Sequence, residues 1–450
     1  MQLKHIAALA ALTVPLVAQA TDGYFSHGYG MKAKGMGGAS TAVAGQDAFG
    51  GANNPALMAF AGNRFDVGID LFSPWREASR SGGGAFGLDG TAKSDSNYFG
   101  IPEAAFNYMV RPNLALGVTV YGNGGMNTDY SNGQLPSPGA CGPAGPPFGF
   151  TTAAGPYNLL CGTTALGVNL SQLIIAPTLA WQFVPNHSLG ISPLWAYQEF
   201  EAYGLQMFDN PGVSTSAGNV TNRGKDSSTG WGARFGYYGQ FTPQLAVGAA
   251  YATKMSMGDF DKYKGLFAEQ GGFDIPSHWS VGVAIRPTPQ WLVALDYERI
   301  DYSDVKSINN PSRNILNCPA LGGTNAANCL GGSDGAGFGW ESVNVFRLGV
   351  QYLLNANWTL RGGYNYTDNP IGSQDVTFNI LAPGVVQNHL TAGATYAWAN
   401  RHEITGAFMY AFSNDVTGPS LYNNLVPGLN AQEKIEMYQW SLGVQYSYKF

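Results

Sequence analysis

The sequence predicts an all-β fold, a transmembrane antiparallel β-barrel of about 14 strands with an N-terminal hatch plugging the lumen. Only 12% of the 450 residues are charged, about half the share of a typical soluble domain, and 13% are aromatic. Apolar and polar residues alternate over many short segments, and the chain shows no apolar run of the roughly 18 residues that a membrane-crossing helix needs. Alternation without long apolar runs is typical of strands that face lipid on one side and a lumen on the other.

Residues 1–20 have the pattern of a secretory signal. They contain one Lys, an apolar run of Ala, Leu and Val, and small residues at Ala18 and Ala20. We expect cleavage after Ala20, because the apolar run is too short to span a membrane, although an uncleaved anchor is the alternative. Loss of Lys4 leaves 22 of the 23 basic residues against 29 acidic ones, a net charge of −7. This balance disfavours nucleic acid as a partner.

The clearest strand is Tyr438–Phe450 at the end of the chain. From Trp440 onward its even-numbered residues are apolar or aromatic, and its odd-numbered residues from Gln439 are polar or small. Such a period of two predicts a strand with one apolar and one polar face. Its terminal aromatic resembles the C-terminal signature of bacterial outer-membrane barrels. An edge strand of a soluble sandwich is the weaker alternative, because sandwich strands are usually shorter.

Similar segments recur along the chain and are separated by two kinds of connection. The other alternating segments include 113–120, 173–183, 279–285, 291–297, 346–354, 358–366, 390–398 and 404–412. Short turns marked by Pro or Asn lie at 111–113, 184–186, 241–244, 286–289, 355–357 and 400–401. Longer connections lie at 77–97, 127–168, 207–228, 259–273, 305–338, 372–386 and 417–434. Short turns that alternate with long loops are typical of an outer-membrane barrel with periplasmic turns.

The stretch Gly28–Phe60 is rich in Gly and Ala and precedes all of these strands. A barrel of intermediate size is too wide for its own side chains to fill. We therefore expect this segment to form a hatch over 21–63 that plugs the lumen. The predicted domains are then a signal peptide over 1–20, the hatch over 21–63, and the transmembrane barrel with its long extracellular loops over 64–450. A disordered tail in place of the hatch is the alternative.

The four cysteines lie in the two longest loops. In an oxidising compartment they predict the disulfides Cys141–Cys161 and Cys318–Cys329, since proximity favours these among the three possible pairings. A metal site is disfavoured because no His lies nearby in the sequence, and we expect no metal and no cofactor.

The loop over 127–168 combines apolar side chains with several prolines. Pinned by its disulfide, it could hold an apolar surface groove, and a plain rigid cap is an equally good interpretation. The candidate groove residues are Phe148, Phe150, Tyr157, Leu159 and Leu160.

The Gly- and Ala-rich run contains Gly28-Tyr29-Gly30 and Gly37-Gly38-Ala39, and the motif Asn54-Pro55-Ala56 follows it. Together they resemble the N-terminal hatch of FadL-type outer-membrane transporters. That family carries long-chain fatty acids and other hydrophobic compounds, and the resemblance covers the whole mature chain. It implies a monomer in contact with outer-membrane lipid that takes up a hydrophobic small molecule passively. It further implies an extracellular groove, an internal apolar pocket and a lateral exit at a kinked third strand.

The third strand should begin at Asn113, and Gly122, Gly124 and Gly125 interrupt its alternation. Gly within a strand often marks a bulge, so these residues are the candidate kink and lateral opening, unless they only begin the next loop. By parity, several charged side chains should face the lumen, where mutual neutralisation is favoured over a clamp for a ligand. These residues are Arg234, Arg347, Arg361, Asp296, Glu298 and Glu103.

Two ligand classes stay open at this point, long-chain fatty acids and aromatic hydrocarbons, because the basic residues that hold a carboxylate in the family cannot be aligned. A general porin is a less favoured function. An enzyme is disfavoured, because His27, His187, His278, His389 and His402 are scattered and sequence alone shows no catalytic geometry.

Overall fold

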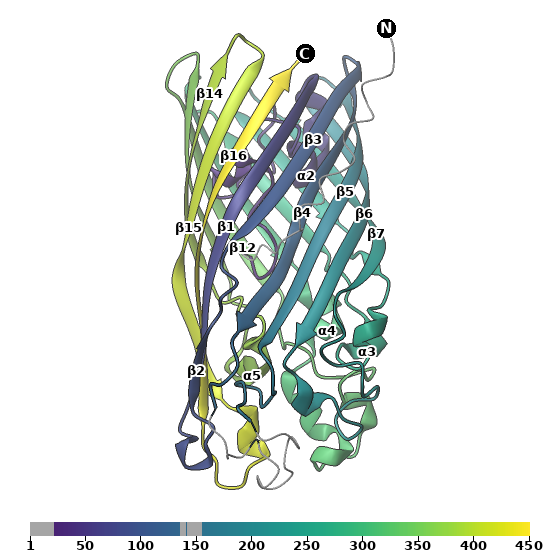
Figure 1. Ribbon diagram of the computed structural model, residues 1–450. Helices are drawn as coiled ribbons and strands as arrows, with labels where there is room; N and C mark the ends of the chain where they lie inside the picture. Colours follow the sequence, from purple (N-terminus) through teal and green to yellow (C-terminus); the bar gives the residue numbers. More distant parts are fainter. Residues whose placement is uncertain (1–21, 136–140, 142–154) are drawn as a thin grey trace.

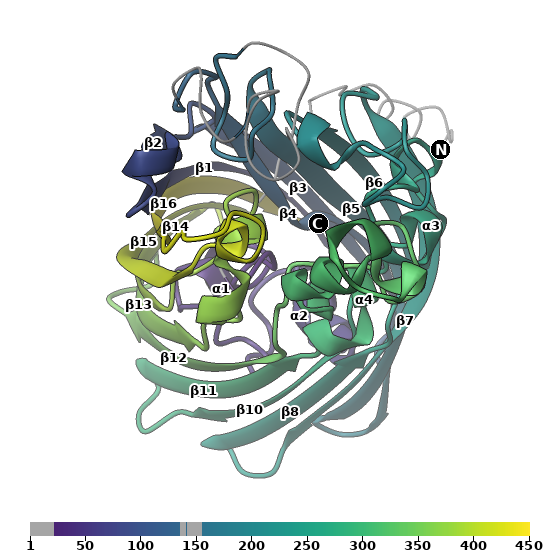
Figure 2. The same cartoon turned by 90° about the horizontal axis from the view of Figure 1, so that it is seen from below.

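The wall of the molecule is a closed barrel of fourteen antiparallel strands. The computed structural model describes residues 22–135, 141 and 155–450. Within them each strand pairs with its neighbours, and β16 pairs with β1 to close the ring (Figure 1, Figure 2). The predicted fold class is therefore confirmed.

The wall strands are β1 (Arg64–Ser81), β3 (Phe99–Arg111), β4 (Leu114–Tyr130), β5 (Leu166–Val184), β6 (His187–Tyr203), β7 (Asp226–Gln240), β8 (Leu245–Ala252), β10 (His278–Ile285), β11 (Trp291–Ile300), β12 (Val343–Leu353), β13 (Trp358–Thr367), β14 (Asn388–Trp398), β15 (His402–Pro419) and β16 (Gln432–Lys449). Two short strands extend this wall: β2 (Gly90–Lys93) pairs with β1, and β9 (Ser256–Met257) pairs with β7.

The helical segments are all short, and none of those described is long and apolar enough to cross a membrane. Three of them precede the wall: α1 (Met31–Lys34), α2 (Gly50–Asn53) and the 3-10 helix η1 (Pro55–Phe60). The others lie in the long connections: η2 (Gly84–Phe86), η3 (Gln206–Phe208), η4 (Asp261–Tyr263), α3 (Ala268–Gly271), η5 (Tyr302–Asp304), α4 (Lys306–Asn309), η6 (Ser312–Asn317), η7 (Pro319–Leu321), η8 (Ala326–Asn328), η9 (Ser373–Asp375), α5 (Val376–Asn379) and η10 (Leu421–Asn424).

The alternation of β16 has the parity that the sequence predicts. Leu442 and Val444 point outward and are 55% and 45% exposed, whereas Gln439 and Gln445 point into the lumen and are fully buried. Each strand can satisfy its backbone hydrogen bonds only through its neighbours, and the pairing of β16 with β1 closes the ring. The outer face is consequently a band of aliphatic and aromatic side chains.

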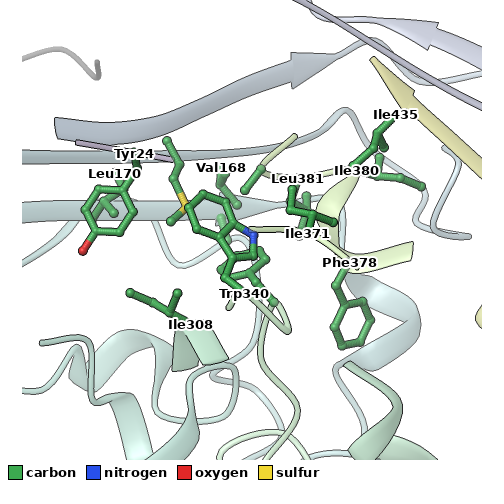
Figure 3. Close-up of a cluster of buried hydrophobic side chains, with 14 of the residues drawn as sticks. Tyr24, Val168, Leu170, Ile308, Trp340, Ile371, Phe378, Ile380, Leu381 and Ile435 are labelled. Carbon is green, nitrogen blue, oxygen red and sulfur yellow. The ribbon is translucent and has the colours of Figure 1, made fainter. Parts of the chain in front are cut away.

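The two ends of the barrel differ. The six predicted short turns connect wall strands directly, for example between Arg111 of β3 and Leu114 of β4. The long connections gather at the other end, where the helices α3, α4 and α5 lie (Figure 1). Their apolar side chains pack into one buried cluster centred near Trp340 (Figure 3). The loops thus form a folded cap over that end.

The first described residues lie inside the ring, where Figure 2 shows α1 and α2. We call residues 22–63 the hatch. Lys32 Nζ lies 2.5 Å from Glu403 Oε2 on β15, and Lys34 Nζ lies 2.8 Å from Asp70 Oδ2 on β1. Both lysines are buried, and a buried charge is tolerated where an opposite charge pairs with it. Small side chains in this segment let its backbone approach the wall closely.

Candidate functional site

The Asn-Pro-Ala motif fastens the hatch to the wall. Asn54 is fully buried, and its side-chain amide donates hydrogen bonds of 2.9 Å to the carbonyls of Thr41 in the hatch and Tyr237 in β7. Its side-chain oxygen accepts the N–H of Ala56 at 3.1 Å and so caps η1. Pro55 lies in the first turn of that helix, where a missing N–H breaks no helical hydrogen bond. The motif is therefore an anchor.

Arg347 links the start of the hatch to the wall. Its Nη2 lies 2.7 Å from Asp22 Oδ2 in the hatch, and its Nη1 lies 2.5 Å from Glu298 Oε2 on β11. All three side chains are buried. Of the predicted lumen charges, Arg347 and Glu298 thus lie together and neutralise each other.

Two further predicted carboxylates accept hydrogen bonds from the hatch backbone. Asp296 Oδ2 accepts the N–H groups of Ser40 at 2.7 Å and Thr41 at 2.8 Å. Glu103 Oε2 accepts the N–H of Gly30 at 3.2 Å. These carboxylates position the hatch, because buried backbone donors need partners inside a lumen filled with protein.

The remaining predicted lumen charges, Arg234 and Arg361, form no ion pair among the described residues. Arg361 Nη1 donates to Thr395 Oγ1 at 2.6 Å. Arg234 donates to the carbonyl of Ala52, and its Nη2 lies 3.3 Å from His278 Nε2. Arg234 also lines a small polar cavity between the hatch and the wall. Within this set, Arg234 alone combines an unpaired charge with a cavity.

The third wall strand, β4, separates from β3 part of the way along its length. The two strands pair as far as Ala104 and Val120. Beyond that point, in the described pairings, β4 continues along β5 and β3 continues along β1. The register between β4 and β5 also shifts between Gly122 and Gly124, which is the mark of a bulge. The glycines that the sequence singles out therefore lie where the wall parts.

The hatch pairs with the portion of β4 that β3 leaves. The N–H of Ser26 donates to the carbonyl of Asn123, and the N–H of Gly125 donates to the carbonyl of Tyr24, both at 3.1 Å. A Cβ at Gly124 would lie 1.7 Å from the carbonyl oxygen of Tyr24. Only Gly allows this approach between the hatch and the bulged strand.

A largely apolar cavity lies at the separation, and we call it the inner cavity. Phe99 at the start of β3 and Gly125–Asn127 of β4 line it, so both edges of the separated wall border the same space. Tyr24 of the hatch and Trp340 of the cap form other parts of its lining. The charged side chain in this lining is Arg76 of β1.

Arg76 brings a buried positive charge to the inner cavity. Its Nη2 donates to Ser94 Oγ at 2.9 Å and to the carbonyl of Ser96, and its guanidinium lies 5.9 Å from the centre of the Phe99 ring. Among the described residues its Nε has no hydrogen-bond partner and the side chain forms no ion pair. Burying an unpaired charge is costly, so this site suits an anionic group on a ligand.

A second apolar cavity lies among the loops of the cap, and we call it the outer cavity. Phe200 of β6 and Val168 of β5 line it together with Phe267, Phe338 and Leu381 from three separate connections. Sequence reasoning did not identify this cavity, because its residues are far apart in the chain and share no local motif.

The predicted groove on the loop over 127–168 stays a prediction. Tyr157, Leu159 and Leu160 are fully buried inside the cap, and Phe148 and Phe150 lie outside the described residues.

Both predicted disulfides are present. Cys141 bonds to Cys161 with the Cα atoms 5.2 Å apart, and Cys318 bonds to Cys329 with the Cα atoms 4.9 Å apart. They close two loops of the cap. The second bond restrains the segment that leads to Phe338 at the outer cavity.

Comparison with known proteins places these features in a family. The family model described as outer membrane protein transport protein (OMPP1/FadL/TodX) matches residues 140–450. The chain belongs to this family. The OMPP1/FadL/TodX proteins are transport channels of the outer membrane for hydrophobic small molecules, and the predicted localisation of the chain in that membrane is confirmed.

Three similar proteins share between 15% and 22% of their residues with this chain. A long-chain fatty acid transport protein from Salmonella typhi is 22% identical over 383 residues, which cover 78% of this chain and 76% of the relative. The crystal structure of the toluene transporter TodX from Pseudomonas putida has a TM-score of 0.65 at 18% identity and covers 94% of this chain and 99% of its own. That of a Pseudomonas aeruginosa FadL homologue has a TM-score of 0.68 at 15% identity and covers 95% of this chain and 100% of its own.

Proposed function

We propose that this member of the family carries amphipathic hydrophobic acids, of which long-chain fatty acids are the simplest, passively across the outer membrane. Ligand enters the outer cavity in the cap, passes to the inner cavity and leaves sideways between β3 and β4. The observation that carries the proposal is the inner cavity itself, which borders both edges of the separated wall at Phe99 and Gly125–Asn127.

The filled lumen supports a lateral exit over an axial one. The hatch occupies the interior with buried ion pairs such as Lys34 with Asp70 and with backbone bonds to wall carboxylates such as Asp296. A straight passage would have to break several of these contacts. Leaving through the wall requires displacement of only the short hatch segment at β4. An apolar ligand also gains by moving directly into the hydrocarbon of the bilayer.

Arg76 supports a ligand with an acidic head group. A carboxylate at the inner cavity would neutralise its guanidinium and accept a charge-assisted hydrogen bond from it. The apolar lining around it, with Phe72, Phe99 and Met437, suits an alkyl chain. A neutral aromatic hydrocarbon would leave the arginine without a counter-charge.

Aromatic hydrocarbons are the second candidate ligand class. The structurally similar TodX is described as a toluene transporter, and both cavities of this chain have several aromatic walls. Offset and edge-to-face packing would hold a small aromatic ligand there.

The test is mass spectrometry of ligand that co-purifies with the protein from its native membrane, combined with uptake by cells that express the full chain. We expect a bound long-chain acid and faster uptake of labelled oleate than of labelled toluene. A bound aromatic hydrocarbon with preferential toluene uptake would favour the second class. Persistent large conductance in planar bilayers would contradict the closed lumen and indicate a general porin.

A further inference from the structure

A thin partition separates the outer cavity from the inner cavity. Phe338 lines the outer cavity and Trp340, two residues later in the same segment, lines the inner one. In a second segment Leu381 lines the outer cavity, and the residues that follow it, 382–384, line the inner one. Figure 3 shows Trp340 between Tyr24 on one side and Leu381 on the other. The two cavities therefore share a wall that is made of these two cap segments.

Asn379 of α5 holds the two segments together. Its Oδ1 accepts the indole N–H of Trp340 at 2.6 Å, and its Nδ2 donates to the carbonyl of Phe338 at 2.6 Å. The same amide donates to the carbonyl of Asp375 at 2.8 Å. Asn379 is fully buried, so water does not compete for these bonds. One side chain thus joins both halves of the partition.

The inner face of the partition rests on the hatch. The ring centres of Trp340 and Tyr24 are 6.1 Å apart, and those of Trp340 and Tyr302 are 5.3 Å apart in an edge-to-face arrangement. Tyr302 Oη in turn accepts the N–H of Tyr24 at 3.1 Å. The indole is 1% exposed and fills the space between the cap and the hatch.

The second segment is also tied to the strand that bulges. Thr128 Oγ1 donates to the carbonyl of Leu381 at 2.8 Å. Thr128 lies in the portion of β4 beyond its separation from β3. The partition is thus bonded to β4 and packed against the hatch, the two elements that border the proposed exit.

We propose that Trp340 is an inner gate, held shut by Asn379, which a ligand must displace to pass from the outer cavity to the inner cavity. This inference rests on the proposed uptake route and adds a residue that selects by size. A slender alkyl chain passes after a small displacement of the indole. A fused ring system needs a larger displacement and is retarded, because the hydrogen bond to Asn379 and the packing on Tyr24 oppose it.

The test compares variants of the full-length protein in cells that lack their own transporter. Trp340→Phe keeps an aromatic ring and removes the N–H, and Asn379→Ala removes its acceptor. We expect Trp340→Phe to raise the initial uptake of labelled oleate by about fivefold, the effect of one buried hydrogen bond on a closed-to-open ratio. Asn379→Ala also removes the bonds to the carbonyls of Phe338 and Asp375, so it should raise uptake at least as much. The double variant should add little to Asn379→Ala, since both changes remove the same bond. Trp340→Ala should in addition admit a fused-ring carboxylate that the natural protein transports slowly.

Asn158→Ala is the matched control. Asn158 is also fully buried in the cap and donates to the carbonyls of Thr164 at 3.0 Å and Gly204 at 2.9 Å, but it lies in the lining of neither apolar cavity. Its loss should leave uptake unchanged. Heat-modifiable migration in gels checks that each barrel is folded. If Asn379→Ala does not fold, oleate uptake by Trp340→Phe alone tests the proposed gate.

Oleate uptake by folded Trp340→Phe at or below the natural rate would overturn the gate while leaving the uptake route intact. No uptake by the natural protein above that of cells without it would instead overturn the proposed function, and the gate with it. The two failures are therefore distinguishable in one experiment.

Discussion

Gly124 of β4 and Tyr24 of the hatch approach so closely that a Cβ on the glycine would lie 1.7 Å from the tyrosine carbonyl oxygen. The contact joins the bulge in the wall to the segment that covers it. Opening of the proposed exit at β4 therefore requires the hatch backbone at Tyr24 to move away from Gly124.

The first prediction concerns this contact. Gly124→Ala should lift the hatch segment from β4 and break its two backbone hydrogen bonds, at a cost of about 1–3 kcal/mol to the local stability of the hatch. Hydrogen exchange over residues 22–28 should accelerate, and oleate uptake should change while the barrel stays folded. Gly406→Ala in β15 is the control, because a Cβ there would meet no described heavy atom within 4 Å. Equal exchange rates in the two variants would contradict the coupling.

The second prediction concerns the head group of the ligand. Arg76→Gln should lower the affinity for oleate about tenfold or more, the usual effect of losing a charge-assisted hydrogen bond. The affinity for the corresponding neutral alcohol should change little. Arg361→Gln is the matched control, since Arg361 is a buried lumen arginine that lies in the lining of neither apolar cavity. Equal losses for acid and alcohol would show that Arg76 only supports the structure.

The third prediction concerns the hatch anchor. Asn54→Ala leaves the buried carbonyl of Thr41 and the half-buried carbonyl of Tyr237 without this donor. We expect the hatch to lose about 1–3 kcal/mol of local stability, read as faster hydrogen exchange over residues 40–60. The thermal stability of the barrel should change little, since the wall strands keep their pairing. Asn113→Ala, at an exposed turn, should leave exchange unaltered.

The fourth prediction concerns pH. His27 in the hatch is 1% exposed, and its ring stacks on His389 with centres 6.3 Å apart. Burial lowers the pKa of His27 well below its usual range, and the charge of Lys34, the neighbouring His389 and the charge of Arg347 lower it further. The folded hatch therefore keeps this ring neutral, whereas the unfolded hatch binds a proton below about pH 6.5.

Because the unfolded state binds more protons, the contribution of His27 to hatch stability is complete above about pH 6.5 and falls as the pH decreases below it. The protection factors for hydrogen exchange over residues 22–60, which divide out the intrinsic pH dependence of exchange, should fall between pH 7.5 and pH 5. His27→Gln should reduce this dependence, and His187→Gln at a short turn should not. Protection factors that stay constant between pH 7.5 and pH 5 in the natural protein would show that His27 does not limit the stability of the hatch.

Much of the wall could be predicted from local patterns. The alternation at Leu442 and Val444 predicted which side chains of β16 face the lipid, and Pro and Asn predicted the positions of the short turns. Both signals depend only on residues that are neighbours in the sequence. The interruption at Gly122 and Gly124 pointed to the register shift for the same reason. Arg76 could also have been found by parity, since it lies on the lumen face of β1 with Arg64 and Asp70.

The cap could not be predicted in the same way. Trp340 meets Asn379 and Tyr24 through contacts between loops that have no period. The outer cavity likewise depends on how several connections pack together. Composition showed that the loop over 127–168 is apolar, but it did not show that Tyr157 would be used for the interior of the cap.

The ion pair between Lys32 and Glu403 has a consequence for the biogenesis of the protein. The hatch is synthesised before the wall strands, yet some of its partners are in the last two strands: Glu403 lies in β15, the N–H of Met31 bonds to Gln445 Oε1 in β16 at 2.8 Å, and β1 must pair with β16 to enclose the hatch. Contacts so distant in sequence form late in folding. These contacts of the hatch therefore form only when the wall closes around it, at the end of insertion into the membrane.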